Sequence, residues 1–376
     1  MGKNFSPFKK IEIVDELQQM KTLSGEWDVL ARHFGTPLLL HGWFAACAEA
    51  LHANDRLSVL MIRSEEELCA IAPMVAVRKG WIEHLELLGA STLMEPGGFI
   101  YAGEEQLKHL IHALLATRRP VILRRLHAES IQPRSLTECC KRRALCLFRE
   151  MPGSLWFEIH PNWKTFDESI PSRRLKRLQR KQRAAERMGR VEYEVIAPGN
   201  EHLADYLKEL FEVENAGWKG RNGTSILAHP DMEQFITCFS QTAVQNGSLR
   251  LFFMRINGEV IAARMAILYA NRLWEIKIGY DEKFSHCSPG LLLTHETIKY
   301  AFEQGLEAYE FLGDEESWEY LWTNKSHPYV AAHIYPFSIL GFIALGKDLC
   351  RFAGKKSIKL AGMVSSFAKK SGKKKV

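Results

Sequence analysis

The sequence lacks the cysteine and histidine patterns of disulfide-rich and zinc-binding proteins. Its 376 residues include eight cysteines. No two of them form a CxxC pair, and no His/Cys group has the spacing of a zinc site. We therefore expect free thiols in a reducing compartment and no metal site.

Long apolar segments are missing as well. The first ten residues, MGKNFSPFKK, contain no apolar core of a signal peptide, and no apolar run is long enough to cross a bilayer. We expect a cytoplasmic protein. Contact with a membrane surface through the C-terminal segment Gly354–Val376 is an additional expectation, because it has eight lysines and no acidic residue. The alternative there is a docked helix followed by a disordered Lys-rich tail.

The composition is that of an ordinary globular protein. Hydrophobic residues make up 46% of the chain and charged residues 25%, and the length allows two domains. The net charge of +6 is concentrated in the stretch Arg173–Arg190 and in the C-terminal tail. This uneven distribution predicts local contacts with anionic partners rather than a generally basic surface.

Three apolar runs joined by turn signals organise the second half of the chain. Leu249–Ile256 is followed by Asn257-Gly258, Val260–Tyr269 by Ala270-Asn271, and then comes Arg272–Tyr280. An Asn-Gly pair between apolar runs is a strong hairpin signal, so we predict three antiparallel strands. A loop, a helix over Leu291–Glu303 and a short strand over Ala308–Leu312 are expected to follow.

The same order of elements is expected earlier in the chain. Leu57–Ile62, Leu68–Val77 and Trp81–Leu88 have the pattern of strands. A loop with Pro96-Gly97-Gly98, a helix over Glu104–Thr117 and a strand over Val121–Leu126 follow. The two stretches share no evident residue identity. The pattern favours a structural duplication, and chance recurrence of a common unit is the alternative.

Between the two repeats lies a strongly basic stretch, SRRLKRLQRKQRAAERMGR. We expect a helix with Ser172 as its N-cap and Gly189 at its end. Its nine Arg or Lys residues and single Glu186 leave only a narrow apolar stripe for docking. A solvated face, a nucleic-acid contact and an entrance for an anionic substrate are all compatible with this pattern. No aromatic residue is interleaved for base stacking, which disfavours specific RNA recognition. Before this stretch, Ile131–Phe148 is expected to be helical, and Leu155–Ile159 to form a strand.

The loop between the third strand and the following helix is the strongest candidate for a binding site. It contains Ser288-Pro289-Gly290 directly before the helix. Proline suits the first turn of a helix, glycine allows close approach of a ligand, and free N–H groups at a helix start bind phosphate. The simpler reading, that these residues only begin a helix, is outweighed by the position of the loop in the strand order.

Several motifs together make the second half resemble a known family. They are Trp218–Ile226 (WKGRNGTSI), His286–Leu293 (HCSPGLLL), Glu303–Gly305 and Leu312–Trp322 (LGDEESWEYLW), preceded by the basic stretch. In this order they resemble the CelD-like GNAT acyltransferases, bacterial proteins related in fold to the Fem aminoacyltransferases. One departure concerns Glu319, because the family tends to have an aromatic-Lys pair where this chain has Trp318-Glu319.

The resemblance implies an α/β (α+β) fold with tandem GNAT-like mixed sheets flanked by helices. The domains expected from it are 1–160, a degenerate N-terminal GNAT-like domain; 161–195, the basic helix and a connecting strand; 196–335, the C-terminal acyltransferase domain; and 336–376, an apolar segment and the Lys-rich tail. The resemblance also implies acyl-CoA, such as acetyl-CoA, as cosubstrate. The expected acceptor is an amine or hydroxyl on a small, sugar-like or cell-envelope molecule, including those of envelope or polysaccharide metabolism.

Direct transfer of this kind needs a base, a carbonyl-polarising donor and an acid for the leaving thiolate. Glu214, Glu275 and Asp314 are the candidate bases, and none is preferred. A backbone N–H of strand Arg272–Tyr280 is the candidate polarising group, and Tyr280 the candidate acid. Cys287 is expected to be a loop residue rather than a nucleophile, because GNAT transfer needs no covalent enzyme intermediate.

Binding roles are assigned to two further groups of residues. The expected cofactor-binding residues are Ile278, His286, Ser288 and Gly290. The expected substrate-binding residues are Trp218, Lys219, Arg221 and Trp318; an indole in a polar, Gly-rich loop such as that of Trp218 is costly unless it covers a ligand.

Two other function classes stay open. A Fem-type ligase would use aminoacyl-tRNA as donor and would employ the basic stretch. A non-catalytic, membrane-peripheral binding protein would employ the tail. Acyl transfer from acyl-CoA is the preferred hypothesis.

Overall fold

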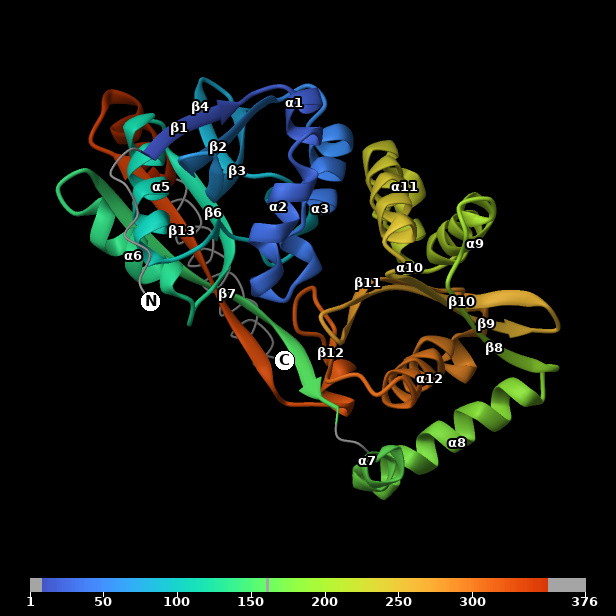
Figure 1. The fold of residues 1–376 in the computed structure, drawn as a ribbon. Coiled ribbons are helices and arrows are strands. Elements are labelled where there is room, and N and C mark those ends of the chain that lie inside the picture. The colour runs from blue at the N-terminus through green and yellow to red at the C-terminus, as the bar shows by residue number, and fades with distance from the viewer. Residues whose placement is uncertain (1–8, 160–161, 351–376) are drawn as a thin grey trace, which may run out of the picture.

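The computed structural model describes residues 9–159 and 162–350. Its centre is one mixed sheet to which both halves of the chain contribute, with strand order β1-β2-β3-β4-β6-β13-β7-β12-β11-β10-β9-β8 (Figure 1). The strands before the basic stretch are β1 (Lys9–Val14), β2 (Arg56–Ser64), β3 (Glu67–Lys79), β4 (Ile82–Leu87), β5 (Ile100–Tyr101), β6 (Val121–His127) and β7 (Ala144–Glu158). Those after it are β8 (Val191–Ile196), β9 (Leu249–Ile256), β10 (Glu259–Tyr269), β11 (Arg272–Tyr280), β12 (Ala308–Glu310) and β13 (Ser326–Pro336).

The two halves of the sheet have the same pairing pattern, so the structural duplication is confirmed. In the first half β2, β3 and β4 are antiparallel, and β6 then pairs parallel with β4. In the second half β9, β10 and β11 are antiparallel, and β12 pairs parallel with β11. The turns form as predicted, because both Asn257-Gly258 and Ala270-Asn271 adopt the positive φ values that tight hairpins require.

The two central strands are exchanged between the halves. β7 follows the first repeat in sequence, yet it pairs with β12 of the second repeat. β13 follows the second repeat and pairs with β6 of the first. β7 and β13 also pair with each other, antiparallel over most of their length. The exchange joins the halves into one continuous sheet.

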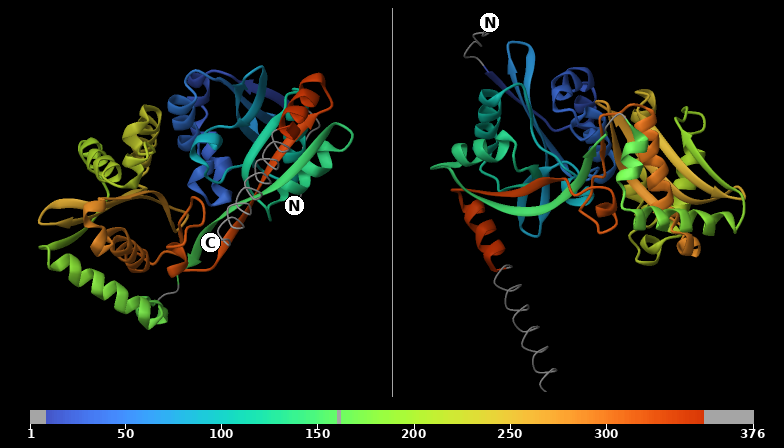
Figure 2. Two further views of the ribbon diagram at one scale, coloured as in Figure 1. Left: turned by 180° about the vertical axis from the view of Figure 1, so that it is seen from behind. Right: turned by 90° about the horizontal axis from the view of Figure 1, so that it is seen from below.

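Helices cover both faces of the sheet (Figures 1 and 2). In the first half they are α1 (Leu17–Lys21), α2 (Ser24–Ala31), α3 (His41–Ala46), α4 (Ala90–Leu93), α5 (Glu104–Ala116) and α6 (Ile131–Cys140). In the second half they are α7 (Trp163–Ser169), α8 (Ser172–Glu186), α9 (Leu203–Asn215), α10 (Trp218–Arg221), α11 (Pro230–Gln245) and α12 (Pro289–Glu303). α9 to α11 lie on one face of the second half, and α12 and α8 on the other (Figure 1).

The halves also pack against each other through aromatic side chains. Trp43 of α3 contacts Phe235 and Phe239 of α11, with ring centroids 5.1 and 5.0 Å apart and nearly perpendicular ring planes. All three side chains belong to a buried apolar cluster that spans both halves. Such edge-to-face pairs add to the free energy of area burial, so this cluster fixes the face that α9 to α11 cover.

Two local predictions need correction. The helix expected over Ile131–Phe148 ends at Cys140, and residues from Ala144 onward form the long strand β7. The Pro152-Gly153 pair inside β7 sits opposite an irregularity in β13, where a missing N–H breaks no ladder hydrogen bond. The basic helix α8 begins at Ser172, but Pro171 occupies the N-cap position and no side chain caps it.

Of the expected C-terminal segment 336–376, only residues 336–350 belong to the described part of the chain. Residues 339–350 are helical, and the Lys-rich segment Gly354–Val376 falls outside the described residues. Within residues 9–159 and 162–350, no helix combines the length and apolar character required to traverse a bilayer.

Candidate functional site

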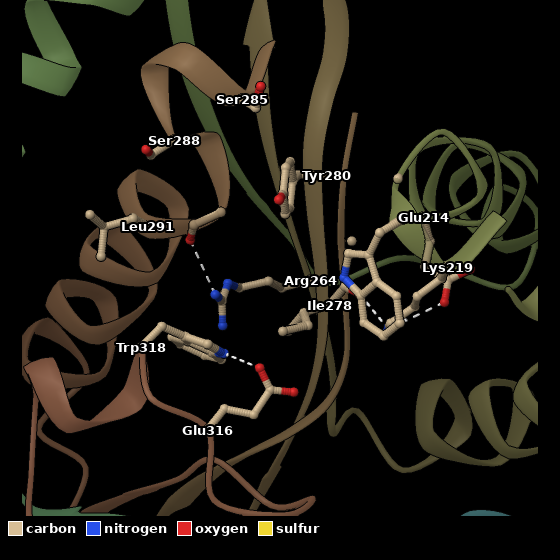
Figure 3. A pocket seen from close by; sticks show the side chains of 14 residues that line it. Glu214, Lys219, Arg264, Ile278, Tyr280, Ser285, Ser288, Leu291, Glu316 and Trp318 are labelled. Atoms are coloured by element: carbon tan, nitrogen blue, oxygen red, sulfur yellow. Dashed lines mark hydrogen bonds and ion pairs between the residues drawn. The ribbon is translucent and has the colours of Figure 1, made fainter. Parts of the chain in front are cut away.

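A cavity of about 380 Å³ opens between the end of β11 and the start of α12. Figure 3 shows its walls: α9 and α10 on one side, α12 on the other, and the segment after β12 below. It is lined by Glu214, Gly217, Trp218, Lys219, Arg264, Ile278, Gly279, Tyr280, Ser285, Ser288, Gly290, Leu291, Glu316 and Trp318. Eight of the twelve predicted site residues are among them: Glu214, Trp218, Lys219, Ile278, Tyr280, Ser288, Gly290 and Trp318.

The cavity exists because β11 and β12 separate after a short parallel contact. They pair only through Arg272–Trp274 of β11, although β11 continues to Tyr280. The β10–β11 ladder also skips Ile276, which is the mark of a β-bulge and turns the following side chains. Beyond the bulge, the edge of β11 that faces away from β10 has no strand partner among the described residues.

The free edge of β11 offers backbone hydrogen-bonding groups to the cavity. The carbonyl of Ile278 accepts a hydrogen bond from Lys219 Nζ at 3.0 Å. In an antiparallel strand the N–H and C=O of one residue point to the same side, so the Ile278 N–H faces this edge as well. It is a preorganised donor of the kind that stabilises a developing oxyanion.

The start of α12 forms the opposite wall. Ser288 adopts a left-handed conformation with φ 53°, and Pro289 is the first helical residue. The N–H groups of Leu291 and Leu292 bond to the Ser288 carbonyl, and Gly290 comes before them. No acidic residue lies in the first turn of α12, so the positive end of the helix dipole stays uncompensated there.

Glycines permit the close contacts around this wall. A Cβ atom at Gly290 would lie 3.3 Å from Cδ1 of Tyr280, whose ring covers the loop. A Cβ atom at Gly279 would lie 2.6 Å from Cα of Glu214, so α9 rests directly on β11. Side chains at either position would move the walls of the cavity.

Glu214 and Lys219 form the α9–α10 side of the cavity. Glu214 is 3% exposed. One of its carboxylate oxygens lies 3.3 Å from Lys219 Nζ, and the other accepts the Ile226 N–H at 3.0 Å. The expected polar loop around Trp218 is a short helix, and the Trp218 side chain is 45% exposed beside the cavity. Both Glu214 oxygens therefore have protein partners, and the ion pair holds Lys219 over β11.

Arg264 is a site residue that the sequence reasoning missed. It projects from the middle of β10, is 2% exposed and lines the cavity. It forms an ion pair with Glu275, donates to the Gly290 carbonyl at 3.2 Å and lies 5.6 Å from the centre of the Trp318 ring. Its Nε is buried without a hydrogen-bond partner. A lone arginine inside the apolar run VIAARMAILY was the available signal, because a buried charge needs a partner or a function.

The segment after β12 contains Glu316, a second site residue that the sequence reasoning missed. It also contains Glu319, where the sequence departs from the resemblance described above. Glu316 lines the cavity and accepts a hydrogen bond from Trp318 Nε1 at 2.6 Å. Glu319 is buried behind it and accepts the Glu316 N–H at 3.2 Å. Burial, together with the Glu275 and Glu316 carboxylates, raises the pKa of Glu319 to about 8. Where the family tends to have a lysine, this chain has a carboxyl group that is mostly neutral at pH 7.

Four predicted site residues do not line the cavity. Glu275 lies on the α12 face of β11, bound to Arg264 and to the Tyr309 hydroxyl, which donates to it at 2.6 Å. Asp314 pairs with the buried Arg125 of the first half. Arg221 is 70% exposed and pairs with Glu282. His286 contacts Met188, which lies just after the end of α8.

Cys287 lies beside the site without entering it. Its side chain is fully buried, and its thiol donates to the Phe284 carbonyl at 3.0 Å. Burial raises the pKa of this thiol. A protonated, hydrogen-bonded thiol supports the structural role expected for it. In the described part of the chain, no group of three or more His, Cys, Asp or Glu side chains is arranged to hold a metal ion.

Comparisons with known proteins agree with this architecture. Residues 172–320 match the family model described as an acetyltransferase (GNAT) domain. None of the curated proteins compared with the chain matches it. This match lies within the second half, and the matched residues include all those that line the cavity.

Two solved structures share the fold over most of the chain. FemX has 11% sequence identity and a TM-score of 0.53, with 87% of this chain and 97% of that chain covered. A conserved protein of unknown function from Bacteroides thetaiotaomicron VPI-5482 has 11% identity and a TM-score of 0.54, with 86% and 100% covered. The fold is the expected α/β arrangement of tandem GNAT-like sheets. At this identity the similarity concerns the fold alone.

Proposed function

We propose that the protein is an acyltransferase that moves an acyl group from acyl-CoA to an amine or hydroxyl acceptor. The observation that carries the proposal is the cavity itself. One wall is a helix start without acidic residues in its first turn, and the other is the free edge of a bulged strand. The first suits the phosphates of the donor, and the second suits its pantetheine amides and thioester carbonyl.

The residues at the site fit such a donor. Ser285 and Ser288 present hydroxyl groups near the α12 start, and neither hydroxyl has a hydrogen-bond partner among the described residues. In our proposal these hydroxyls and the Gly290 N–H hold the phosphates, while Ile278 and Tyr280 flank the chain of the donor. Acyl-CoA supplies an activated thioester, so the enzyme needs no covalent intermediate.

The reaction then depends on polarisation and proton transfer. In the proposal the Ile278 N–H stabilises the oxyanion as the acceptor attacks the thioester carbon. The C–S bond breaks, and the Tyr280 hydroxyl protonates the thiolate. Glu214 is the only candidate base of the three that lines the cavity, but both of its oxygens already have protein partners. We therefore propose two roles for Glu214. Its main role is to orient Lys219 through the ion pair, and its second is to remove the acceptor's proton directly or through a water molecule.

A thermal-shift titration with acetyl-CoA tests the proposal. The wild-type melting temperature is expected to rise with ligand concentration, because a ligand that binds the folded state stabilises it. Gly290→Trp is expected to abolish the rise by filling the space against Tyr280. Gly25→Trp is the matched control, because a Cβ at Gly25 meets nothing within 4 Å. No shift with any acyl-CoA in the wild type would refute acyl-CoA as the donor.

One observation favours a second candidate, a Fem-type ligase that uses aminoacyl-tRNA. α8 packs beside the loop between β11 and α12, and Lys181 of this helix donates to the His286 carbonyl. Its outer face is basic and exposed at Arg173, Lys176, Arg177, Arg180 and Arg183. A polyanionic donor could bind this face while its acyl end reaches the cavity.

Binding to tRNA separates the two candidates. The ligase hypothesis predicts salt-sensitive binding that weakens at least tenfold when Arg173, Arg177 and Arg180 are changed to Ala. The control variant replaces the exposed Arg32, Lys141 and Lys208, which lie on other surfaces. Equal binding by both triple variants would exclude a specific role of α8. Arg174 is left intact because it donates to the Leu321 carbonyl at 2.9 Å.

The membrane-peripheral hypothesis rests on residues outside the described ranges and stays a prediction. Binding to anionic liposomes, compared between the full chain and a chain that ends at residue 353, measures the contribution of the tail. Acyl transfer that persists without lipid would contradict a purely non-catalytic role.

A further inference from the structure

A second cavity, of about 460 Å³, lies between the two halves of the molecule. The first half contributes residues of β6 and of the loops around Thr36 and Pro96, and the second half contributes residues of β11, β12 and β13. Trp274, which belongs to the apolar cluster on the α9–α11 side of the sheet, forms part of its wall. The GNAT domain alone would therefore hold only part of this cavity.

A buried carboxylate organises the polar side of the cavity. Glu310 is 1% exposed. One of its oxygens accepts from Arg272 at 2.7 Å, and the other lies 3.0 Å from His327 Nε2. The His327 ring is stacked on Trp156, with centroids 4.8 Å apart and 6° between the planes. The histidine is thus held in one orientation by a carboxylate and an indole.

Two imidazole nitrogens are left for a ligand. His327 uses Nε2 for Glu310, so its Nδ1 is a free acceptor when the ring is neutral. The neighbouring His127, with its centroid 5.5 Å from that of His327, accepts the Glu129 N–H at Nδ1. Its Nε2 therefore carries the proton and is a donor. Neither remaining nitrogen has a partner among the described residues, so donor and acceptor stand side by side.

The charges of the cavity are balanced by the protein itself. Arg272 is paired with Glu310, and Arg125 with Asp314. Burial lowers the pKa of His127, so this ring is neutral at pH 7. The arginines that line this cavity are thus already compensated, which disfavours a phosphate group as ligand. Tyr101, Tyr329 and Trp274 supply aromatic surface between the polar groups.

Both cavities are lined by residues of β11, and Lys277 of this strand interacts with charged groups near each of them. Lys277 lies just beyond the β11 bulge and next to Ile278, and Glu95, Glu214 and Lys219 act on its charge. Glu95 directly precedes Pro96 and Gly97, which line the second cavity. Trp274 and Ile278 are four residues apart on one strand, a span of roughly 13 Å. An extended group can bridge that span.

We propose that the second cavity binds the acyl acceptor, and that this acceptor is a hydroxyl-rich ring compound without phosphate, such as a sugar or an amino sugar. Its hydroxyls bond to His127 and His327, its ring packs on aromatic side chains, and its reactive amine or hydroxyl extends along Lys277 toward Ile278. The assignment as acceptor rests on the proposed acyl-transfer function. The existence of the binding site and the chemistry of its ligand do not depend on that function.

Saturation-transfer NMR with glucosamine as the probe tests the assignment on the full chain. Signal is expected both without and with saturating acetyl-CoA, because the two ligands occupy different cavities. Glucosamine 6-phosphate is expected to bind at least about fivefold more weakly, because the cavity has no uncompensated cation to balance a phosphate. Tighter binding of the phosphate would overturn the charge argument.

Histidine variants locate the site. His127→Phe and His327→Phe keep a ring and remove the nitrogens, and each is expected to lose most of the signal. His112→Phe, at a partly buried histidine of α5 outside the cavity, is expected to keep it. Absence of signal in the wild type, equal signal in all variants, or displacement by acetyl-CoA would overturn the proposal. A glucosamine signal in a protein that shows no acetyl-CoA shift would instead refute the donor and leave the second site standing.

Discussion

The two halves of the molecule share one strand order, yet the cavities next to the ends of their third strands differ in size. In the first half, the loop next to the end of β4 surrounds a cavity of about 10 Å³, lined mainly by apolar side chains such as Trp43, Phe44 and Leu87. In the second half, the corresponding space measures about 380 Å³ and is bounded by Gly279 and Gly290. The scaffold permits the site, and the size of the side chains at the strand separation determines whether it is open.

The loops before the two helices differ in the same sense. In the first half Gln132 fills the space beside Gly98, and its Oε1 accepts the Phe99 N–H at 2.9 Å. α5 also carries Glu104 and Glu105 in its first turn. In the first half, side chains of the protein thus satisfy the loop and compensate the helix dipole, whereas α12 has no acidic residue in its first turn and no side-chain cap. The following changes alter residues of the second half at or near its cavity.

The largest expected effect concerns Arg264, whose counterpart strand β3 buries only apolar side chains such as Met74. Arg264→Met leaves the buried Glu275 without its cation, which is expected to cost about 3–5 kcal/mol of unfolding free energy. Urea denaturation measures the loss. Adding Glu275→Gln is expected to restore much of it, because the residual buried charge disappears. Equal stability of the single and double variants would contradict the ion-pair account.

The second change is Gly279→Ala at the contact between β11 and α9. The added methyl group meets the Glu214 backbone 2.6 Å away, so α9 has to shift. We expect a loss of about 1–3 kcal/mol and weaker acetyl-CoA binding. Gly25→Ala, in open space on α2, is the control and is expected to be neutral or slightly stabilising. Stability equal to wild type would show that the close packing is not required.

The third change, Glu319→Gln, acts through pH. The pKa of this carboxyl is raised from its ordinary 4.5 to about 8, so the folded state holds its proton more tightly than the unfolded state. Its contribution to stability is complete below pH 4.5 and is lost as pH rises through about 8. The glutamine variant lacks this loss, so its stability relative to wild type is expected to rise as pH increases from 5 to 8.5. Parallel stability profiles of the two proteins from pH 5 to 8.5 would contradict the shifted pKa.

The smallest effect is expected from copying the acidic first turn of α5 into α12. Leu291→Glu places a carboxylate in the first turn of α12, at the wall of the cavity. Acetyl-CoA affinity is expected to fall about tenfold, corresponding to about 1.4 kcal/mol, through repulsion of the phosphates and compensation of the dipole. Calorimetric titration measures it, with Leu291→Gln as the control of similar size. Equal affinities of the two variants would place the phosphates elsewhere.

Sequence reasoning succeeded where a feature is local. The hairpins around Asn257 and Ala270, the helix start at Ser288 and the repeated element order follow from turn chemistry and periodicity within short stretches. It failed for β7, because the residues up to Phe148 were assigned to the preceding helix and the strand was expected to begin only at Leu155. The exchange of β7 and β13 is a long-range pairing that no local pattern encodes.

The residues of the candidate site show the same difference between local and long-range features. Residues within the recognised motifs line the cavity, among them Trp218, Lys219 and Gly290. Glu275 was a candidate as a carboxylate within the third strand, and Asp314 as one just after the next strand. Their orientation depends on Arg264 and Arg125, which belong to other elements. Burial and pairing across the sheet decide which carboxylates reach the cavity, and both are properties of the assembled fold.

The most direct test of the central claim is calorimetric titration of the full chain with acetyl-CoA. The difference between the halves predicts one site per chain, lost in Gly290→Trp and retained in Gly25→Trp. Two equivalent sites, or binding unaffected by Gly290→Trp, would contradict the assignment of the donor to the cavity between β11 and α12.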